Sequence, residues 1–188
     1  MKTDSPRWSQ LFGDLESQIE ALADAEELGE IAERTRIETG RLALVDRLRP
    51  AEGHVITVRA AGAGMVRGRL DRVGADWLLL TEPPGVEALI PLASLVAVTG
   101  LGRWSAADGQ LDRRLGLRSA LRELVRDRAP VRILLVDGGS VAGTIDRVGL
   151  DFLELAEHPA GEPRRASSVL RVWTLPLHGV GVVRRGGI

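Results

Sequence analysis

The sequence predicts a mainly β protein (α+β at most) in which two related, compact modules follow a long N-terminal helix. Three observations support this fold class: a helical spacing of apolar residues near the start of the chain, an internal repeat at an offset of 75 residues, and alternating apolar residues between glycine-rich turns in both copies. Of the 188 residues, 44% are hydrophobic but only 3% are aromatic. The core is therefore expected to consist of Leu, Val, Ile and Ala.

The first predicted element is helical and covers residues 6–49. Ser5 and Pro6 suit the N-cap and the first helical position, and Pro50 ends the pattern. Two internal glycines weaken it, so the segment is either one long helix or a helical hairpin. Residues 1–50 contain 7 basic and 11 acidic residues, which makes the polar face of the helix acidic.

The internal repeat is the main feature of the rest of the chain. Residues 68–80 align without gaps on residues 143–155, and 8 of the 13 positions are identical. Agreement at one fixed offset indicates a duplicated structural unit. The turn glycines Gly74 and Gly149 recur in both copies and are expected to supply positive φ.

Each copy contains the same predicted elements: a short helix followed by five short strands. The helices are predicted at 42–49 and 115–128. In the first copy, strands are predicted at 55–60, 77–80, 88–91 and 95–98, with the second strand of the copy ending at Val73. In the second copy, they are predicted at 131–136, 152–155, 164–166 and 169–173, with the second strand ending at Val148. Many short strands in so small a unit favour a closed barrel, because closure leaves no exposed edge.

The predicted domain organisation has four parts. Residues 1–41 form the acidic helical segment, residues 42–102 the first barrel unit, and residues 103–176 the second unit with an arginine-rich leading helix. Residues 177–188 are expected to be a mobile C-terminal tail.

The stretch 131–145 resembles the first motif of the Sm-like (Lsm) family of small SH3-like barrels. It combines an alternating strand, a glycine turn and a Gly-x-hydrophobic start to the next strand. The resemblance implies two tandem Sm-like barrels. The RNA-contacting Asp and Asn of that family are replaced by Gly149 and Leu153, so the resemblance does not extend to the RNA site. The whole chain is also similar to an uncharacterised actinobacterial family sometimes labelled as transcriptional regulators, although no helix-turn-helix pattern is present.

The sequence indicates no catalytic, cofactor or metal site. There is no Cys, and the three histidines (His54, His158 and His178) lie in or beside predicted turns without ligand-spaced partners. Two pairs of aspartates recur at the same spacing in both copies, and we expect them to form turns rather than acid–base pairs. The paired residues are Asp71 with Asp76 and Asp146 with Asp151. We therefore expect a protein that is not an enzyme.

Arginines form the first candidate contact surface. Residues 103–188 contain 14 basic and 10 acidic residues, and four arginines at four-residue spacing share one side of the predicted helix. Such a row can contact phosphates or an acidic partner. It can equally be a solvated face paired with nearby carboxylates, or a dock for the acidic N-terminal segment. The candidate residues are Arg114, Arg118, Arg122 and Arg126, together with Arg164 and Arg165.

The second candidate surface is apolar and lies in the N-terminal helix. It is either an exposed contact for a partner or for self-association, or a stripe that packs back on a barrel. Its residues are Trp8, Leu11, Phe12 and Leu15.

The expected function is that of a non-enzymatic interaction or scaffold protein, which binds a protein partner or itself through the N-terminal helix. The alternative is an RNA- or DNA-binding regulator that uses the arginine-rich second unit. The chain shows no signal-peptide pattern and no apolar run long enough for a membrane span, so we expect a cytoplasmic protein without a membrane partner.

Overall fold

The computed structural model describes residues 40, 42–102, 115–159 and 164–186. The chain divides into two compact units, Met1–Leu42 and Ala43–Ile188. Apart from Gly40 and Leu42, the described residues lie in the second unit. Trp8, Leu11, Phe12, Leu15 and Arg114 lie outside the described residues, so the predictions made for them stay predictions.

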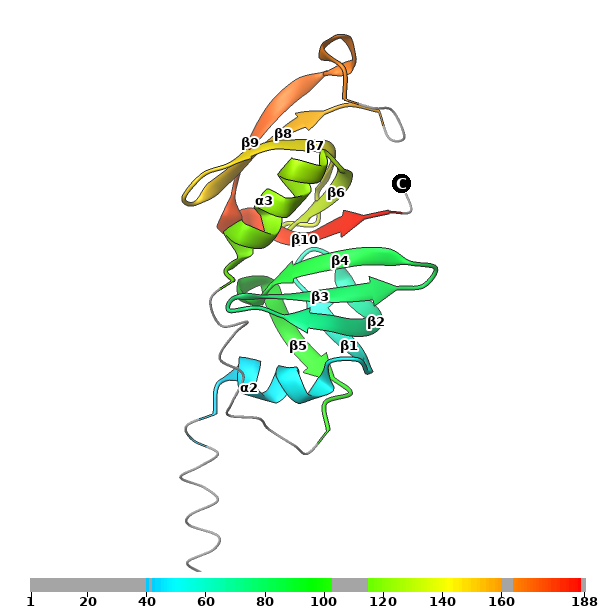
Figure 1. The fold of residues 1–188 in the computed structure, drawn as a ribbon, viewed down its shortest axis with the longest axis vertical. Helices are drawn as coiled ribbons and strands as arrows, with labels where there is room; N and C mark the ends of the chain where they lie inside the picture. Colours follow the sequence, from blue (N-terminus) through cyan, green and yellow to red (C-terminus); the bar gives the residue numbers. More distant parts are fainter. Residues whose placement is uncertain (1–39, 41, 103–114, 160–163, 187–188) are drawn as a thin grey trace, which may run out of the picture. The chain divides into compact units, whose positions relative to one another are not determined.

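A single ten-stranded antiparallel sheet forms the second unit, in the order β5-β1-β2-β3-β4-β10-β6-β7-β8-β9 (Figure 1). The first five strands are β1 (Val55–Ala60), β2 (Gly64–Val73), β3 (Trp77–Glu82), β4 (Val86–Pro91) and β5 (Leu95–Thr99). The other five are β6 (Pro130–Leu135), β7 (Ser140–Val148), β8 (Phe152–Glu157), β9 (Arg171–Pro176) and β10 (Val180–Arg185).

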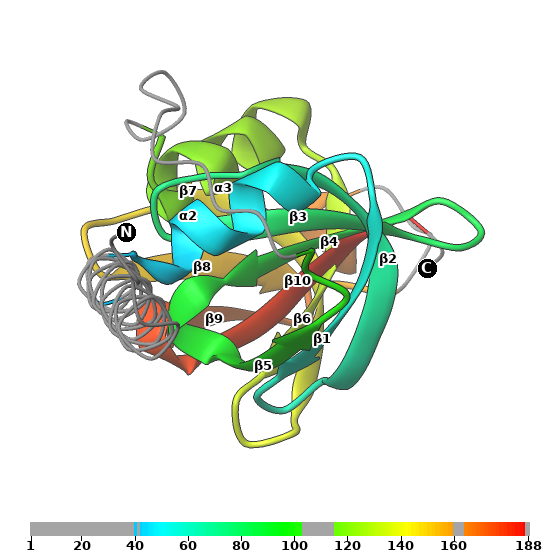
Figure 2. The same cartoon turned by 90° about the horizontal axis from the view of Figure 1, so that it is seen from below.

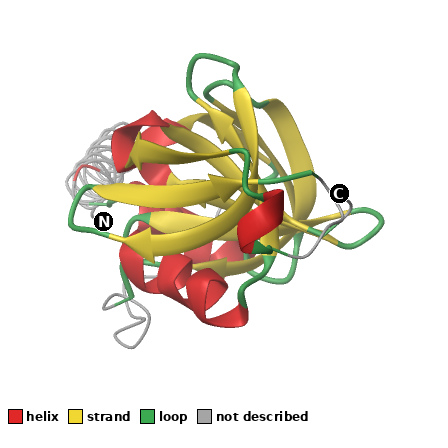
Figure 3. Ribbon diagram, turned by 90° about the horizontal axis from the view of Figure 1, so that it is seen from above, coloured by secondary structure: helices red, strands yellow, loops and turns green. Residues whose placement is uncertain are grey.

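Short helices connect or cover these strands. The α-helices are α2 (Leu44–Leu48) and α3 (Leu117–Asp127), and the 3₁₀ helices are η1 (Arg49–Ala51), η2 (Leu92–Ser94), η4 (Ala166–Ser168) and η5 (Leu177–Gly179). Helix α2 lies across the strands of the first half (Figure 2), and α3 packs mainly on β7 (Figure 1). In Figure 3 the helices, drawn in red, lie on the outside of the strands. We call α2 with β1–β5 the first repeat and α3 with β6–β10 the second repeat.

The predicted pair of closed Sm-like or SH3-like barrels is wrong. The sheet is open, with β5 and β9 at its two edges. Strand β10 pairs with β6 of its own repeat and also with β4 of the first repeat. In a closed barrel, the backbone N–H and C=O groups of β4 and β10 would pair within their own repeat. In this structure these two strands pair with each other instead, across the two repeats.

The prediction of a long helix reaching residue 49 is also wrong. Residues 1–39 and 41 lie outside the described part, but α2 has only five residues and starts afresh after Ala43, whose backbone is extended. The Asp46 carboxylate accepts a hydrogen bond from the Ala43 N–H at 3.1 Å, which fixes this new start. A helix continuing through this point would need helical dihedral angles at Ala43.

The second half of each repeat aligns at a different offset from the first half. Strands β6, β7 and β8 follow β1, β2 and β3 by 75 residues, whereas β9 and β10 follow β4 and β5 by 85. The connection between β8 and β9 (residues 158–170) is longer than that between β3 and β4 (residues 83–85), which explains the shift. The strands predicted at 164–166 and 169–173 are therefore misplaced, and the predicted C-terminal tail contains η5 and β10.

Two hydrophobic clusters form the core, and each contains residues from both repeats. The first cluster contains the buried faces of β1–β4 together with Val182 of β10. The second contains the buried faces of β6–β8 and α3, together with Trp77 and Leu89 of the first repeat. Val182 and Val183 are neighbours in β10 and point to opposite faces, so one strand serves both clusters.

Gly74 and Gly149 serve ring packing rather than the positive φ expected for them. A Cβ atom at Gly74 would lie 2.2 Å from Nε1 of Trp77, and one at Gly149 would lie 2.4 Å from a ring atom of Phe152. Neither glycine is among those with positive φ. Each aromatic ring thus lies directly over the backbone of the preceding turn.

Candidate interaction surfaces

The two edge strands expose apolar side chains. Val96 of β5 is 62% exposed, and Val172 of β9 is 54% exposed. Leu170, directly before β9, and Trp173 within it are exposed as well. Among the described strands, each edge strand has one neighbour in the sheet, so a row of its backbone N–H and C=O groups has no partner strand in this part of the chain.

The junction between β4 and β10 shows how such edges pair in this molecule. The strands are antiparallel, with Val183 opposite Leu89, Arg184 opposite Ala88, and Arg185 opposite Glu87. Arg184 also binds Glu82 through two hydrogen bonds, Nε–Oε2 at 2.7 Å and Nη2–Oε1 at 3.1 Å. Paired arginine–carboxylate hydrogen bonds of this kind fix the register as well as adding energy.

The repeat makes the free edges counterparts of the two strands at the junction. Strand β9 corresponds to β4, and β5 corresponds to β10, at the offset of 85. Ala88 of β4 and Val182 of β10 are fully buried, whereas their counterparts Trp173 and Ala97 are exposed. The strand edges that pair at the β4–β10 junction are thus buried, whereas the equivalent edges of β9 and β5 are exposed at the two ends of the sheet.

The free edges lack the charged contacts of the junction. The counterparts of Arg184 and Arg185 are Thr99 and Gly100, and the counterpart of Glu87 is Val172. The sequence had indicated neither edge strand, because the residues of β5 were aligned with those of β9. The structure shows that the counterpart of β5 is β10, 85 residues later. The sequence signal for the correct offset of 85 is a Pro-Leu pair followed by valines, which occurs at Pro91 and again at Pro176.

A small polar cluster covers part of the β9 edge. Arg171 lies 3.0 Å from Glu157 and 5.5 Å from the centre of the Trp173 ring. The Trp173 indole N–H donates to Glu157 at 2.6 Å. Charged side chains on an edge strand limit indiscriminate pairing.

The predicted arginine row lies on the outer face of α3. Arg118, Arg122 and Arg126 are exposed, while Leu117 and Leu121 on the other side of the helix are buried. Arg126 binds Glu123 at 2.9 Å, on the same helix. Arg118 and Arg122 make no hydrogen bond or ion pair with any residue that the structure describes.

Beside α3, the structure brings Arg126 and Arg164 together around a depression of about 440 Å³, which we call the basic hollow. Its lining residues are Val125, Arg126, Arg128, Thr144, Ile145, Asp146 and Arg164. Arg164 binds both carboxylate oxygens of Asp146, with Nε 2.7 Å from Oδ1 and Nη2 2.8 Å from Oδ2. Three guanidinium groups and one carboxylate therefore surround the hollow, and Arg165 is exposed but does not line it.

Arg128 is the member of the basic hollow that the sequence did not indicate. It follows the last turn of α3 in the left-handed conformation, with φ of 49°. This C-cap turns the side chain off the line of the helix. The signal in the sequence is the position of Arg128, between the arginine row and the Pro130 that prevents a longer helix.

His158 is buried, although it was expected to be a turn histidine. Its Nδ1 lies 3.1 Å from the Pro159 carbonyl oxygen, and its Nε2 lies 2.9 Å from the Thr144 hydroxyl. A carbonyl oxygen can only accept, so Nδ1 donates to Pro159, while the Thr144 hydroxyl, which can donate or accept, satisfies Nε2. His158 thus has a satisfied structural role.

Asp76 is likewise more than a turn residue. Its Oδ1 accepts a hydrogen bond from the Leu117 N–H at 2.6 Å, at the start of α3. The indole N–H of Trp77 donates to the Leu115 carbonyl at 2.8 Å. The first repeat therefore holds the N-terminus of the helix that belongs to the second.

Among the residues that the structure describes, no three or more His, Asp or Glu side chains are grouped so as to hold a metal ion. Nor does this part of the chain contain a helix both long and apolar enough to cross a membrane. Comparisons with family models, with curated proteins and with solved structures found no match. The surfaces described above are therefore the basis for a proposal of function.

Proposed function

We propose that the protein is a non-enzymatic interaction protein that binds further copies of itself through the free edges of its sheet. The observation that carries this proposal is the correspondence of β9 with β4 and of β5 with β10. In the proposed contact, β9 of one copy pairs antiparallel with β5 of the next, as β4 pairs with β10 within one chain. Such a contact joins two different surfaces, so it produces a closed ring or an open row of copies.

The register of the β4–β10 junction specifies the proposed contact in detail. Thr174 would lie opposite Val98 of the neighbouring copy, and Trp173 opposite Thr99. Ala97 would enter the neighbouring core as Val182 does inside the chain. Since the contact lacks the Arg184–Glu82 pair, we expect it to be weaker than the junction and to depend on concentration.

Two edge variants test the proposal, each placing one charge on one edge. Ala97→Lys blocks β5 and Thr174→Lys blocks β9; both residues are exposed, so the fold should tolerate the changes. Leu150→Lys is the matched control, because Leu150 is an exposed apolar residue in the turn before β8. The masses of the full-length proteins are measured by light scattering and sedimentation velocity over a concentration series.

We expect wild type and Leu150→Lys to associate as concentration rises. Each edge variant alone should remain monomeric, because every head-to-tail contact needs both edges. An equimolar mixture of the two variants should form a 1:1 dimer, since one supplies a free β9 and the other a free β5. Wild type that stays monomeric throughout, or edge variants that associate like wild type, would refute the proposal.

A second candidate function is contact with nucleic-acid phosphates. It is supported by the basic hollow, which Arg126, Arg128 and Arg164 line together. Fluorescence anisotropy with labelled single-stranded RNA and duplex DNA, over a salt series, tests it. We expect binding that weakens steeply with salt, and Arg128→Ala should lower both affinity and salt slope while the control Arg67→Ala, in the first repeat, should not. Absence of binding at about 50 mM salt would exclude this function.

A further inference from the structure

An apolar groove runs between α3 and the sheet; it shares no lining residue with the basic hollow and includes no residue of the edge strands β5 and β9. Its volume is about 460 Å³. Its floor is a row of side chains across three strands, Leu79 of β3, Leu89 of β4 and Val183 of β10, which lie opposite one another in register. Ala120 and Leu124 of α3 line it from the helix side.

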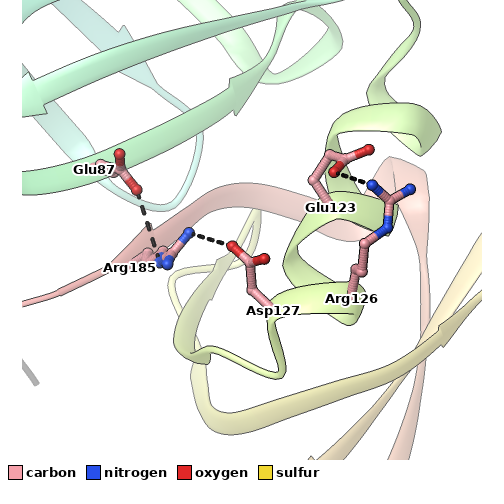
Figure 4. Close-up of polar contacts among 5 residues, drawn as sticks. All are labelled: Glu87, Glu123, Arg126, Asp127 and Arg185. Carbon is pink, nitrogen blue, oxygen red and sulfur yellow. Dashed lines mark hydrogen bonds and ion pairs between the residues drawn. The ribbon is translucent and has the colours of Figure 1, made fainter.

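Four charged residues line the groove, and three of them are neutralised by neighbours (Figure 4). Arg185 lies 2.9 Å from Asp127 and 3.9 Å from Glu87. Glu123 is bound by Arg126 at 2.9 Å. Arg72, the fourth, makes no hydrogen bond or ion pair with any residue in the described part of the chain.

The second repeat shows what partner this arginine has when its surroundings are polar. Arg147 is the counterpart of Arg72, and it binds Glu154 with 2.6 Å between Nη2 and Oε1. The hydrogen bond that Arg147 donates to Glu154, together with the negative charge of Glu154, raises the pKa of Arg147 above its ordinary value. Glu154 lies directly opposite Arg147 in the β7–β8 ladder, as Leu79 lies opposite Arg72 in the β2–β3 ladder.

In the first repeat, therefore, the carboxylate has been replaced by a leucine, and that leucine forms part of the groove floor. The neighbouring position changes in the same direction: Thr174 of the second repeat corresponds to Leu89 of the first, which also lies on the floor. The arginine itself is kept in both copies. The first repeat thus combines an uncompensated guanidinium with an apolar surface next to it.

We propose that this groove binds a small-molecule carboxylate with an apolar body, such as a medium-chain aliphatic acid. The apolar part lies on Leu79, Leu89 and Leu124, and the carboxylate binds Arg72 in the way Glu154 binds Arg147. The guanidinium geometry suits a carboxylate with two parallel hydrogen bonds. The volume is within the range of about 300–1,000 Å³ usual for small-molecule sites. The site does not depend on self-association, because it lies at the internal β4–β10 junction.

The test compares two ligands that differ only in the head group. Isothermal titration calorimetry measures the binding of sodium octanoate, below its micelle concentration, and of 1-octanol to the full-length protein. Three variants complete the design: Arg72→Gln removes the charge, Ala120→Trp fills the groove, and Arg147→Gln is the control at the equivalent arginine outside it.

We expect saturable 1:1 binding of octanoate to wild type and to Arg147→Gln. Arg72→Gln should weaken octanoate binding about tenfold or more, as expected for hydrogen bonds to a charged group, and should leave octanol binding unchanged. Ala120→Trp should abolish binding of both. The proposal is overturned if octanoate does not saturate, if it binds no better than octanol, or if Arg72→Gln binds it like wild type. Arg72 is exposed and makes no hydrogen bond or ion pair with the residues that the structure describes, so that variant should retain its fold and the result stays interpretable.

Discussion

Two equivalent leucines allow a direct test of whether the repeats unfold as one sheet. Leu78 and Leu153 are counterparts in β3 and β8, and both are fully buried. Leu78 belongs to the first core cluster and Leu153 to the second. The variants Leu78→Ala and Leu153→Ala therefore apply the same chemical change to different clusters, and each serves as the control for the other.

The expected loss of stability is similar for both variants. Truncation of a fully buried leucine to alanine typically costs about 2.7–5 kcal/mol of unfolding free energy. Domains have about 5–15 kcal/mol in total, so the loss is a large fraction of the stability, and both variants are measured at 25 °C where the wild type exceeds about 5 kcal/mol. Because Val182 joins the first cluster from β10, while Trp77 and Leu89 join the second from the first repeat, the loss should be shared by both repeats.

Hydrogen exchange monitored separately for each strand provides the assay, supported by urea unfolding. In Leu153→Ala, we expect the opening free energy of amides in β2, in the first repeat, to fall by as much as that of amides in β7, in the second. In Leu78→Ala, the opening free energy of amides in β7 should likewise fall by as much as that of amides in β2. Urea unfolding followed by circular dichroism and by tryptophan fluorescence should give one coincident transition. If the β2 amides of Leu153→Ala exchange at the same rate as those of the wild type, the reasoning is refuted and the repeats unfold independently.

Three further predictions concern single contacts, and a fourth concerns the N-terminal segment. Asp76→Ala removes the carboxylate that accepts from the first N–H of α3, and urea unfolding should show a loss of about 0.5–2 kcal/mol. Gly149→Ala forces a Cβ into the Phe152 ring and should cost about 1–3 kcal/mol; no measurable loss would contradict the ring-packing role. Arg49 is the ion-pair partner of the buried Asp46 at 3.7 Å, so Arg49→Met leaves that buried carboxylate with one favourable contact fewer and should lower stability by about 1–3 kcal/mol; a neutral or stabilising effect would contradict this. Deletion of residues 1–42 should leave the association state at each concentration unchanged if the sheet edges drive association, whereas a shift to monomer would favour a contact through the N-terminal segment.

The first three strands of each repeat could be located from the sequence. Alternating apolar residues and the Asp-Arg-Val-Gly turns are local signals, and β1 covers the predicted residues 55–60. The last two strands of the second repeat were misplaced, because a constant offset of 75 was carried past the longer β8–β9 connection. An insertion in a loop changes spacing without changing the strands, so the later pattern at Pro176 had to be matched independently.

The candidate surfaces could be predicted only in part. Four-residue spacing indicated that Arg118, Arg122 and Arg126 share one face of a helix, as they do in α3. Spacing along the chain could not predict that Arg164 lies beside the same hollow as Arg126, because the two residues are far apart in sequence and only the fold brings them close. The role of Arg72 depends on its cross-strand neighbour Leu79, which only the register defines.

The sequence by itself determined that a β-rich unit is duplicated and where most strands begin and end, because alternation and turn residues act over a few neighbouring positions. Only the tertiary structure decided that the repeats share one open sheet. An edge strand can satisfy its backbone groups with either of two neighbours, and no local pattern distinguishes them. The choice depends on side chains far apart in sequence: Val182 enters the first core, and Arg184 binds Glu82. The same choice leaves β5 and β9 free at the two ends of the sheet.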